Sequence, residues 1–214
     1  MNTEAQLTLV QWLSAGFPVG AFSYSHGLER AVHDGDVRCA ESFGEWLNDV
    51  LTLGTGRNDA ILLSQAHNAQ DGDRLRALDT LGRALSPSRE RLMETDLQGA
   101  AFCKTVSAIW GQALDDLVYP VAVGAAARAQ GIDRAIAVSH YLHAFAANLT
   151  SAAIRLVPLG QTEGHAVLNQ THSLCLQIAR DSADLTTDDL GGCCFAADIA
   201  SMTHETQYSR LFRS

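Results

Sequence analysis

Three side chains near the N-terminus are of the types that support nucleophilic catalysis. Ser25 lies in the run Ser23-Tyr24-Ser25-His26-Gly27, and Glu29 follows it closely. The run resembles the nucleophile turn of serine hydrolases, in which two glycines allow a strained passage from a strand to a helix. Here Ser23 stands where the first glycine is needed, and no strand pattern precedes it. Capping of a helix by Ser23 or Ser25 is the better interpretation, and a small helical hydrolase using Ser25, His26 and Glu29 remains the alternative.

Histidines and cysteines offer a second kind of chemistry, the binding of a metal ion. His140 and His143 lie one helical turn apart and could share a metal, but no cysteine or carboxylate accompanies them in the sequence. Such histidines more often form hydrogen bonds inside a protein. Cys193 and Cys194 are adjacent, which is poor geometry for holding one ion through both thiolates. We therefore predict no metal site and no cofactor, with a dedicated nickel carrier as a weaker alternative.

Two further motifs are incomplete at a residue that their chemistry requires. His204-Glu205 begins like a helical zinc motif, but Tyr208 stands where the second histidine is needed. A phosphate-binding P-loop needs a glycine directly before its lysine, and Cys103 precedes Lys104, the only lysine of the chain. Nucleotide chemistry is therefore expected from another chain. Together these motifs favour a protein that is not an enzyme.

Helical periodicity dominates the elements that must position these residues. Asp133 is a plausible N-cap for a central helix that ends before Pro158. Its apolar positions recur at steps of three and four, which places them on one face. They are Ala135, Val138, Leu142, Phe145, Leu149, Ala152 and Leu156. A second helix is predicted over 119–131, with Pro120 in its first turn and Gly131 at its end.

Breaks of a similar kind divide the rest of the chain. Gly54 to Gly56 and Asp71-Gly72 mark breaks, and Ser86-Pro87 opens a helix, whereas residues 16–20 and 186–194 are predicted loops. No convincing period-two alternation indicates a strand. The sequence therefore predicts an all-α fold, a compact bundle of roughly eight to eleven helices around a central buried helix. Residues 1–214 are expected to form a single domain.

The composition argues against several classes of function. Of the 214 residues, 47% are hydrophobic and 18% charged, and the formal net charge is −9. Binding to nucleic acid is not expected, because phosphate backbones need clustered lysine and arginine. The uncharged stretch 135–154 holds too many polar residues for a membrane span. Five irregularly spaced cysteines, with no signal peptide ahead of them, predict a reducing compartment, and we expect the cytoplasm.

Charge is unevenly distributed along the chain. Residues 71–96 include 11 charged residues in 26, whereas residues 97–179 include only 8 in 83. The first segment is typical of solvated helix surface, and the second must be core or interface. So much uncharged sequence makes a homodimer a reasonable expectation.

The last residues differ from an ordinary frayed terminus. Residues 204–214 include Tyr208, Arg210, Leu211, Phe212 and Arg213, residue types that are enriched at the energetic hot spots of protein interfaces. We interpret residues 204–214 as a docking segment. A terminal helix packed on its own domain is an equal alternative from composition alone.

Three segments together resemble the urease accessory protein UreF family. The first runs from Phe17 to Glu29, the second comprises Asn148-Leu149 with Ser151 to Thr162, and the third runs from His204 to Ser214. Their order and spacing extend the resemblance over essentially the whole chain. The chain departs from the family pattern at Ala15, His26 and Thr203, where members often have proline, glutamine and arginine.

The resemblance implies a non-enzymatic, all-α helper in urease maturation, a nickel-insertion chaperone. Members bind a second accessory protein, UreD (UreH in some species), and the GTPase UreG. In the family this assembly docks on apo-urease and supports GTP-dependent nickel delivery and carbamylation of the active-site lysine. Modulation of the GTPase by the chain is a further expectation from the same resemblance.

The resemblance also assigns roles to residues. The loop at Pro18 to Gly20 and the helix start that follows would shape a surface shared with the GTPase, with Tyr24 as an aromatic anchor. The residues expected to bind partners are Pro18, Gly20, Tyr24, Ser25, Gly27, Glu29, His204, Glu205, Gln207, Tyr208, Arg210, Leu211, Phe212 and Arg213.

Two further expectations follow from the same resemblance. Arg155 and Gln161 would fix the turn around Pro158 and Gly160, which is a structural role. The last eleven residues would become ordered on binding the UreD-type partner, with Arg210 and Arg213 as forked donors and Phe212 as an apolar plug.

Overall fold

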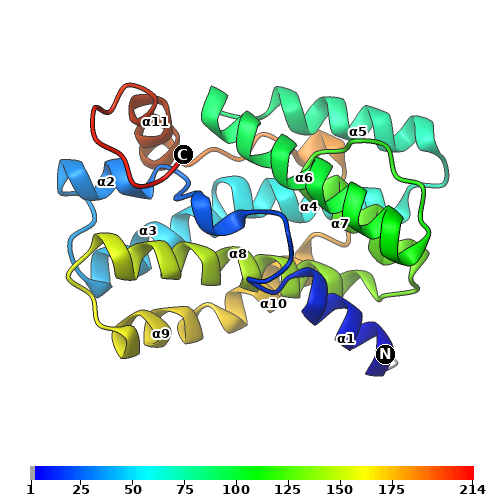
Figure 1. Cartoon of the computed structure of the whole chain (residues 1–214), viewed down its shortest axis with the longest axis horizontal. Coiled ribbons are helices and arrows are strands. Elements are labelled where there is room, and N and C mark those ends of the chain that lie inside the picture. Colours follow the sequence, from blue (N-terminus) through cyan, green and yellow to red (C-terminus); the bar gives the residue numbers. More distant parts are fainter. Residues whose placement is uncertain (1–2) are drawn as a thin grey trace.

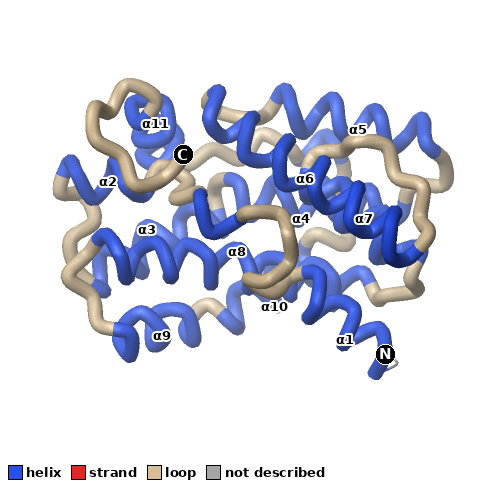
Figure 2. Tube along the Cα trace, in the orientation of Figure 1, coloured by secondary structure: helices blue, strands red, loops and turns tan. Residues whose placement is uncertain are grey.

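A computed structural model describes residues 3–214, and every regular element in that range is helical (Figure 2). The all-α prediction is thereby confirmed. The α-helices are α1 (Thr3–Trp12), α2 (Leu28–Asp34), α3 (Ala40–Thr52), α4 (Thr55–Asn68), α5 (Gly72–Ala84), α6 (Arg89–Trp110), α7 (Tyr119–Ala129), α8 (Arg134–Leu156), α9 (Gln161–Gln170), α10 (His172–Asp181) and α11 (Phe195–His204), with short 3-10 turns at Ala21–Ser23 and Thr187–Asp189.

Helix α8 runs through the middle of the molecule, and the other helices are arranged around it (Figure 1). Helix α4 packs against α8 and carries α7 on another side, and α7 in turn packs against α6. Helices α9 and α10 cover α8 from a different direction. Helix α2 packs against α11, and the C-terminus lies beside this pair, whereas the N-terminus lies at α1.

Local sequence signals explain where several of these helices begin. The carboxylate of Asp133 accepts a hydrogen bond from the backbone N–H of Ile136 (3.0 Å), which caps α8 as its sequence predicts. Pro120 lies in the first turn of α7, where its missing N–H costs nothing. Helix α6 is capped by Ser88, whose hydroxyl accepts from the N–H of Arg91 (3.1 Å). No helix in residues 3–214 combines the length and apolar character that crossing a membrane requires.

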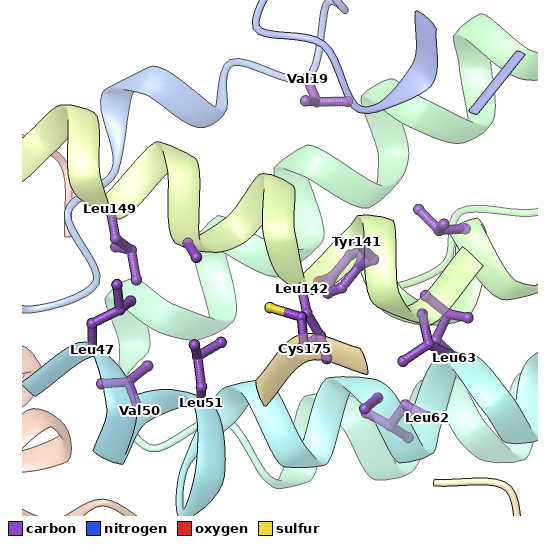
Figure 3. Packing of buried hydrophobic residues seen from close by; sticks show 14 of the residues in the cluster. Val19, Leu47, Val50, Leu51, Leu62, Leu63, Tyr141, Leu142, Leu149 and Cys175 are labelled. Carbon is purple, nitrogen blue, oxygen red and sulfur yellow. The ribbon is translucent and has the colours of Figure 1, made fainter. Parts of the chain in front are cut away.

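In α7 and α8, the low number of charged residues is explained by burial inside the domain. Leu142 and Leu149 of α8 are fully or almost fully buried. Figure 3 shows Leu149 directed toward Leu47 of α3, and Leu142 beside Cys175 of α10. Helix α7 is almost entirely buried along its length. The central uncharged helix is therefore the main structural element of the core, as predicted.

Close helix contacts are made through small residues. A Cβ added to Gly124 of α7 would overlap with the carbonyl oxygen of Leu63 on α4. A Cβ added to Gly99 of α6 would overlap with the carbonyl oxygen of Leu117 and lie 2.8 Å from the backbone nitrogen of Tyr119. Backbones this close gain dispersion contacts that a larger side chain would forbid. The alanine-rich and glycine-containing composition of α7 follows from this packing.

Replacing Gly99 by alanine tests this account of α6. Alanine is favoured over glycine by about 1 kcal/mol within a helix, but overlap with fixed backbone atoms costs about 1–3 kcal/mol or more. Relative to Gly44→Ala, which has the same gain in helix propensity, we expect Gly99→Ala to lower the free energy of unfolding by about 1–3 kcal/mol, measured by urea denaturation. Gly44→Ala on α3 is the control, because its added Cβ would meet only Val167 Cγ1 at 3.7 Å. Equal stability of the two variants would contradict the packing account.

Candidate functional site

The C-terminal strap, residues 205–214, folds back along α2, α6 and α11 (Figure 1, red). Its backbone meets the segment before α2: the N–H of Arg213 donates to the carbonyl of Ser23 (2.9 Å), and the N–H of Ser25 donates to the carbonyl of Ser214 (2.9 Å). The Ser25 hydroxyl donates to the same Ser214 carbonyl. The first and third family-like segments, far apart in sequence, therefore lie side by side.

Glu29 of α2 is the central acceptor for the strap. Its carboxylate accepts hydrogen bonds from the N–H groups of Leu211 (2.7 Å) and Phe212 (2.9 Å). Glu29 is 6% exposed. A carboxylate this deeply buried is costly unless hydrogen bonds and opposite charge satisfy it. The strap backbone supplies part of that satisfaction.

A buried histidine joins Glu29 to a second carboxylate. His204, at the end of α11, has no exposed surface, and its Nδ1 lies 2.6 Å from Glu90 Oε2 while its Nε2 lies 3.3 Å from Glu29 Oε2. Arg210 of the strap also pairs with Glu90, at 2.7 Å. Helices α2, α6 and α11 and the strap are thus connected by one network of charged groups.

A third buried carboxylate on α6 holds the end of the strap. Glu94 is 5% exposed and accepts a hydrogen bond from the Ser214 hydroxyl (2.8 Å). It also forms an ion pair with Arg91, which is buried as well. The N-terminal half of α6 therefore presents two acidic positions, one turn apart, to the strap.

Phe212 is the apolar anchor of the strap. Its side chain is buried, and the guanidinium carbon of Arg155 lies 4.4 Å from the ring centroid. Arg155 also donates to the carbonyl of Phe22 (3.2 Å). The guanidinium of Arg155 therefore reaches the strap and the N-terminal loop, and its expected part in fixing the turn around Pro158 stays a prediction.

The turn between α8 and α9 is closed by a hydrogen bond to the side chain of Glu163. The N–H of Gly160 donates to the carboxylate of Glu163 (2.9 Å), which closes the start of α9. Gln161 is the first residue of α9, and Pro158 lies exposed in the turn. Glu163, which directly follows the last residue of the second family-like segment, Thr162, was not singled out in the sequence.

Gly27 allows α2 to approach α11. Its φ of 79° lies in the left-handed region, and an added Cβ would lie 2.8 Å from the backbone nitrogen of Ser201. His26, directly before it, also has a positive φ of 61°. This turn brings Ser25 and Glu29 under the strap, so the glycine of the first motif has a packing role.

Apolar side chains stand exposed on α11 and the strap. Phe195, Ile199 and Met202 recur at steps of four and three on α11, with exposures of 75%, 57% and 49%. Tyr208 and Leu211 of the strap are also exposed. We call these five residues the C-terminal apolar face. The α11 part was missed in the sequence, although its helical spacing was visible there.

Comparisons with known proteins identify the family. A family model described as UreF matches residues 37–172. The urease accessory protein UreF of Roseobacter denitrificans is 54% identical over 214 residues, covering 100% of this chain and 96% of the relative. The chain belongs to the UreF family. The UreF proteins of Cereibacter sphaeroides (strain ATCC 17025) and Mesorhizobium japonicum are 51% and 48% identical, over 99% and 100% of this chain and 100% and 98% of their own lengths.

Among the UreF residues expected to bind partners, the structure separates a surface group from an interior group. Pro18, Tyr208, Arg210, Leu211 and Arg213 are exposed, and Gly20, Glu205 and Gln207 are partly exposed. The interior group comprises Tyr24, Ser25, Gly27, Glu29, His204 and Phe212. Tyr24 is only 3% exposed, so its side chain is covered by the chain itself, and its expected role as an aromatic anchor for another chain stays a prediction. Burial also raises the pKa of its hydroxyl.

Ser25 and His26 are not arranged as the catalytic pair of a serine hydrolase, the alternative considered from the sequence. The Ser25 hydroxyl is directed to the strap, whereas Nε2 of His26 lies 3.1 Å from the Thr55 hydroxyl. Burial holds the pKa of His26 well below its ordinary value, with the nearby Arg91 charge acting in the same direction. Ser25 and His26 therefore lack the hydrogen bond that a nucleophile and its base require.

His140 and His143, the histidines considered for metal binding, are not grouped with further metal-binding side chains in the described residues 3–214. The rings of His143 and His172 are 5.0 Å apart between centroids, and Nδ1 of His140 is hydrogen-bonded to the Ile136 carbonyl (2.9 Å). Within residues 3–214, no group of three or more histidine, cysteine or acidic side chains is arranged to hold a metal ion.

A cavity of about 440 Å³ lies between α1, residues 13–22 and α8. Its wall includes Trp12 and Phe145, and it reaches Asp59 of α4, which accepts a hydrogen bond from the Tyr141 hydroxyl (2.6 Å). Burial raises the pKa of Asp59 to about 6, against the lowering effect of that hydrogen bond. Nothing in the sequence distinguished Asp59 from the other acidic residues.

Asp59 gives a pH-dependent prediction. Because the folded state holds this proton more tightly than the unfolded chain, the carboxyl group lowers stability as pH rises from about 4 through about 6. Asp59→Asn keeps an oxygen for the Tyr141 hydroxyl but cannot ionise. We expect its stability relative to the parent chain to increase between pH 4 and pH 7 in urea titrations. Asp184→Asn, at an exposed position, is the control, and parallel pH profiles for parent chain and Asp59→Asn would contradict the assignment.

Proposed function

We propose that this chain is a non-catalytic scaffold in urease maturation. It would bridge a UreD-type (UreH-type) accessory protein and the GTPase UreG on apo-urease, and so support GTP-dependent nickel delivery and metallocentre assembly. Family membership supports the role in maturation. The relatives are named as accessory proteins of urease, and the bridging role is our extension of that name.

The C-terminal apolar face is the observation that carries the proposal. Exposed side chains of this size on one helix and the adjoining strap are typical of protein-binding surfaces. Tyr208 and Leu211 project from the strap, while Glu29 and Phe212 hold it in place beneath them. The proposed docking segment, residues 204–214, therefore has two parts. Its buried residues, such as His204 and Phe212, hold the exposed Tyr208 and Leu211 in position. We assign this face to the UreD-type partner.

The N-terminal loop is proposed as the contact with the GTPase. Phe22 is 64% exposed and follows the exposed Pro18 and the left-handed Gly20. Phe22 replaces Tyr24 as the aromatic residue of this surface, because Tyr24 points into the domain. Its carbonyl is held by Arg155, which also contacts Phe212, so the two proposed surfaces share one arginine.

The chemistry of GTP is assigned to the partner. The only lysine, Lys104, lies within α6 and has no P-loop around it. The chain could still order the partner's switch loops or supply a side chain to them. A cytoplasmic homodimer remains part of the proposal, although the uncharged centre on which we based self-association is taken up by the domain's own core.

Single charges on the C-terminal apolar face test the proposed docking role. Ile199→Asp and Leu211→Asp should each weaken capture of the UreD-type partner at least about 30-fold, since a hot-spot residue contributes about 2 kcal/mol or more. Helical content by circular dichroism should not change. Leu176→Asp is the matched control, because Leu176 is 52% exposed and its helix, α10, lies away from α11 and the strap (Figure 1).

Point variants are preferable to removing residues 204–214. His204 and Phe212 are buried, so the deletion would remove the partners of the buried carboxylates of Glu29 and Glu90 and would disturb the domain itself. Undiminished partner capture by both aspartate variants would refute docking through this face. If the Leu176 variant also lost partner capture, the loss would not be specific to the C-terminal apolar face.

A further inference from the structure

The cavity between α1, residues 13–22 and α8 has the size of a small-molecule site. Its volume of about 440 Å³ falls within the range of ligand pockets in proteins, about 300–1,000 Å³. It opens to solvent beside Val10 and Phe22, which line it and are 58% and 64% exposed. A small molecule can therefore enter from the surface and become enclosed by the domain.

Aromatic side chains form much of the cavity wall. They come from α1, residues 13–22, α7 and α8, and they are Trp12, Phe17, Phe22, Tyr119, Tyr141 and Phe145. The rings of Tyr119 and Tyr141 are in contact, with centroids 5.4 Å apart. Aromatic rings bind apolar groups through their area, and their negative faces attract positive charge. The wall therefore favours an aromatic or aliphatic ligand that is cationic over one that is anionic.

Asp59 of α4 offers this cavity a hydrogen-bond acceptor. Its Oδ2 accepts from the Tyr141 hydroxyl (2.6 Å), whereas no hydrogen bond within residues 3–214 reaches its Oδ1. Asp59 is partly exposed, although α4 packs against both α7 and α8. It also lines a second cavity of about 30 Å³, which has room for about two water molecules. A larger ligand must therefore reach Oδ1 from the cavity of about 440 Å³.

Asp59 is the carboxylate of the cavity wall that has no partner of opposite charge. The other carboxylate, Glu94, forms an ion pair with Arg91, which lines the cavity as well. No ion pair within residues 3–214 joins Asp59 to Arg91, His140 or His143, the groups of the wall that can carry positive charge. Burial raises the pKa of Asp59 to about 6, and the nearby Arg91 charge offsets only part of that effect. Above that pH the cavity therefore holds an ionised carboxylate without a counter-ion.

We infer that the cavity is a binding site for a small organic cation, an amine whose apolar body packs against the aromatic wall while its ammonium group donates to Asp59 Oδ1. The ammonium group supplies both the charge and the donor that this carboxylate lacks. Within residues 3–214 no group of three or more ligating side chains is arranged for a metal ion, so one carboxylate and the rings recognise the cation. This site belongs to the isolated chain and does not depend on the proposed function.

Three ligands of similar size test the inference on the full chain. Phenethylamine, phenethyl alcohol and phenylacetate carry a cationic, a neutral and an anionic head group on the same ring. An NMR titration at pH 7.5, above the pKa of about 6 of Asp59, follows the amides of Ala144 and Ala147 in the cavity wall. We expect the amine to bind at least about tenfold more tightly than either analogue, because only the amine forms an ion pair with Asp59. Equal or tighter binding of an analogue, or no saturable binding of the amine, would overturn the inference.

Removing the charge of Asp59 tests its part in recognition. Asp59→Asn keeps an acceptor for the Tyr141 hydroxyl but has no negative charge. Its affinity for phenethylamine should fall at least about tenfold, while its affinity for phenethyl alcohol should change less than about twofold. Asp184→Asn, at an exposed position, is the matched control and should bind the amine like the parent chain. Parent-like amine affinity in Asp59→Asn would refute recognition by this carboxylate.

Filling the cavity tests its location independently of Asp59. Ala144 lines the cavity and is partly exposed, so Ala144→Trp places a large side chain at the wall and should abolish binding of the amine. Ala129→Trp, at the exposed end of α7, is the matched control and should retain it. Amine binding by Ala144→Trp with the parent's affinity would overturn the site, even if Asp59→Asn failed to fold. Circular dichroism of each variant checks the helical content.

Discussion

The arrangement of α2, α6, α11 and the strap depends on the burial of carboxylates. Glu29, Glu90 and Glu94 are each at least nine-tenths buried, and such groups are tolerated only when charge and hydrogen bonds satisfy them. Apart from Arg91, which pairs with Glu94 on the same helix, the partners described above come from the strap and from His204, at sequence separations of more than one hundred residues. Fixing the end of the chain and satisfying the acidic positions are therefore one structural event, which also orients the exposed Tyr208 and Leu211.

The other helices form a closely packed core, and the strap lies against its surface. Small residues let α7 lie against α4 and α6 at backbone distance, and α8 carries the apolar face around which α3, α9 and α10 pack. Arg155 links this core to the strap, because it extends from the end of α8 to the Phe212 ring. Under the proposed scaffold function, such a core would hold the loops that face other chains in fixed positions.

The polar residues of the first family-like segment are used for contacts inside the domain. The buried His26 is kept neutral, and Ser25 is occupied by the strap. The polar groups that sequence reasoning considered for catalysis serve instead as internal connections. The exposed apolar side chains of the C-terminal apolar face lie on α11 and on the strap, the two segments that these buried contacts hold together. A surface formed in this way depends on contacts between segments that are far apart in the sequence.

The sequence by itself determined the helical class, the cap at Asp133, the central buried helix and the family, because helix periodicity and motifs are local properties of neighbouring residues. Only the tertiary structure decided which side chains of the motifs face outward. Tyr24 and Phe212 look like interface anchors by type but are buried, and Arg155 reaches past its own turn to the strap. The exposed face of α11 had the spacing of an ordinary core helix. Burial is set by contacts between residues far apart in the chain, and side-chain type and spacing do not contain that information.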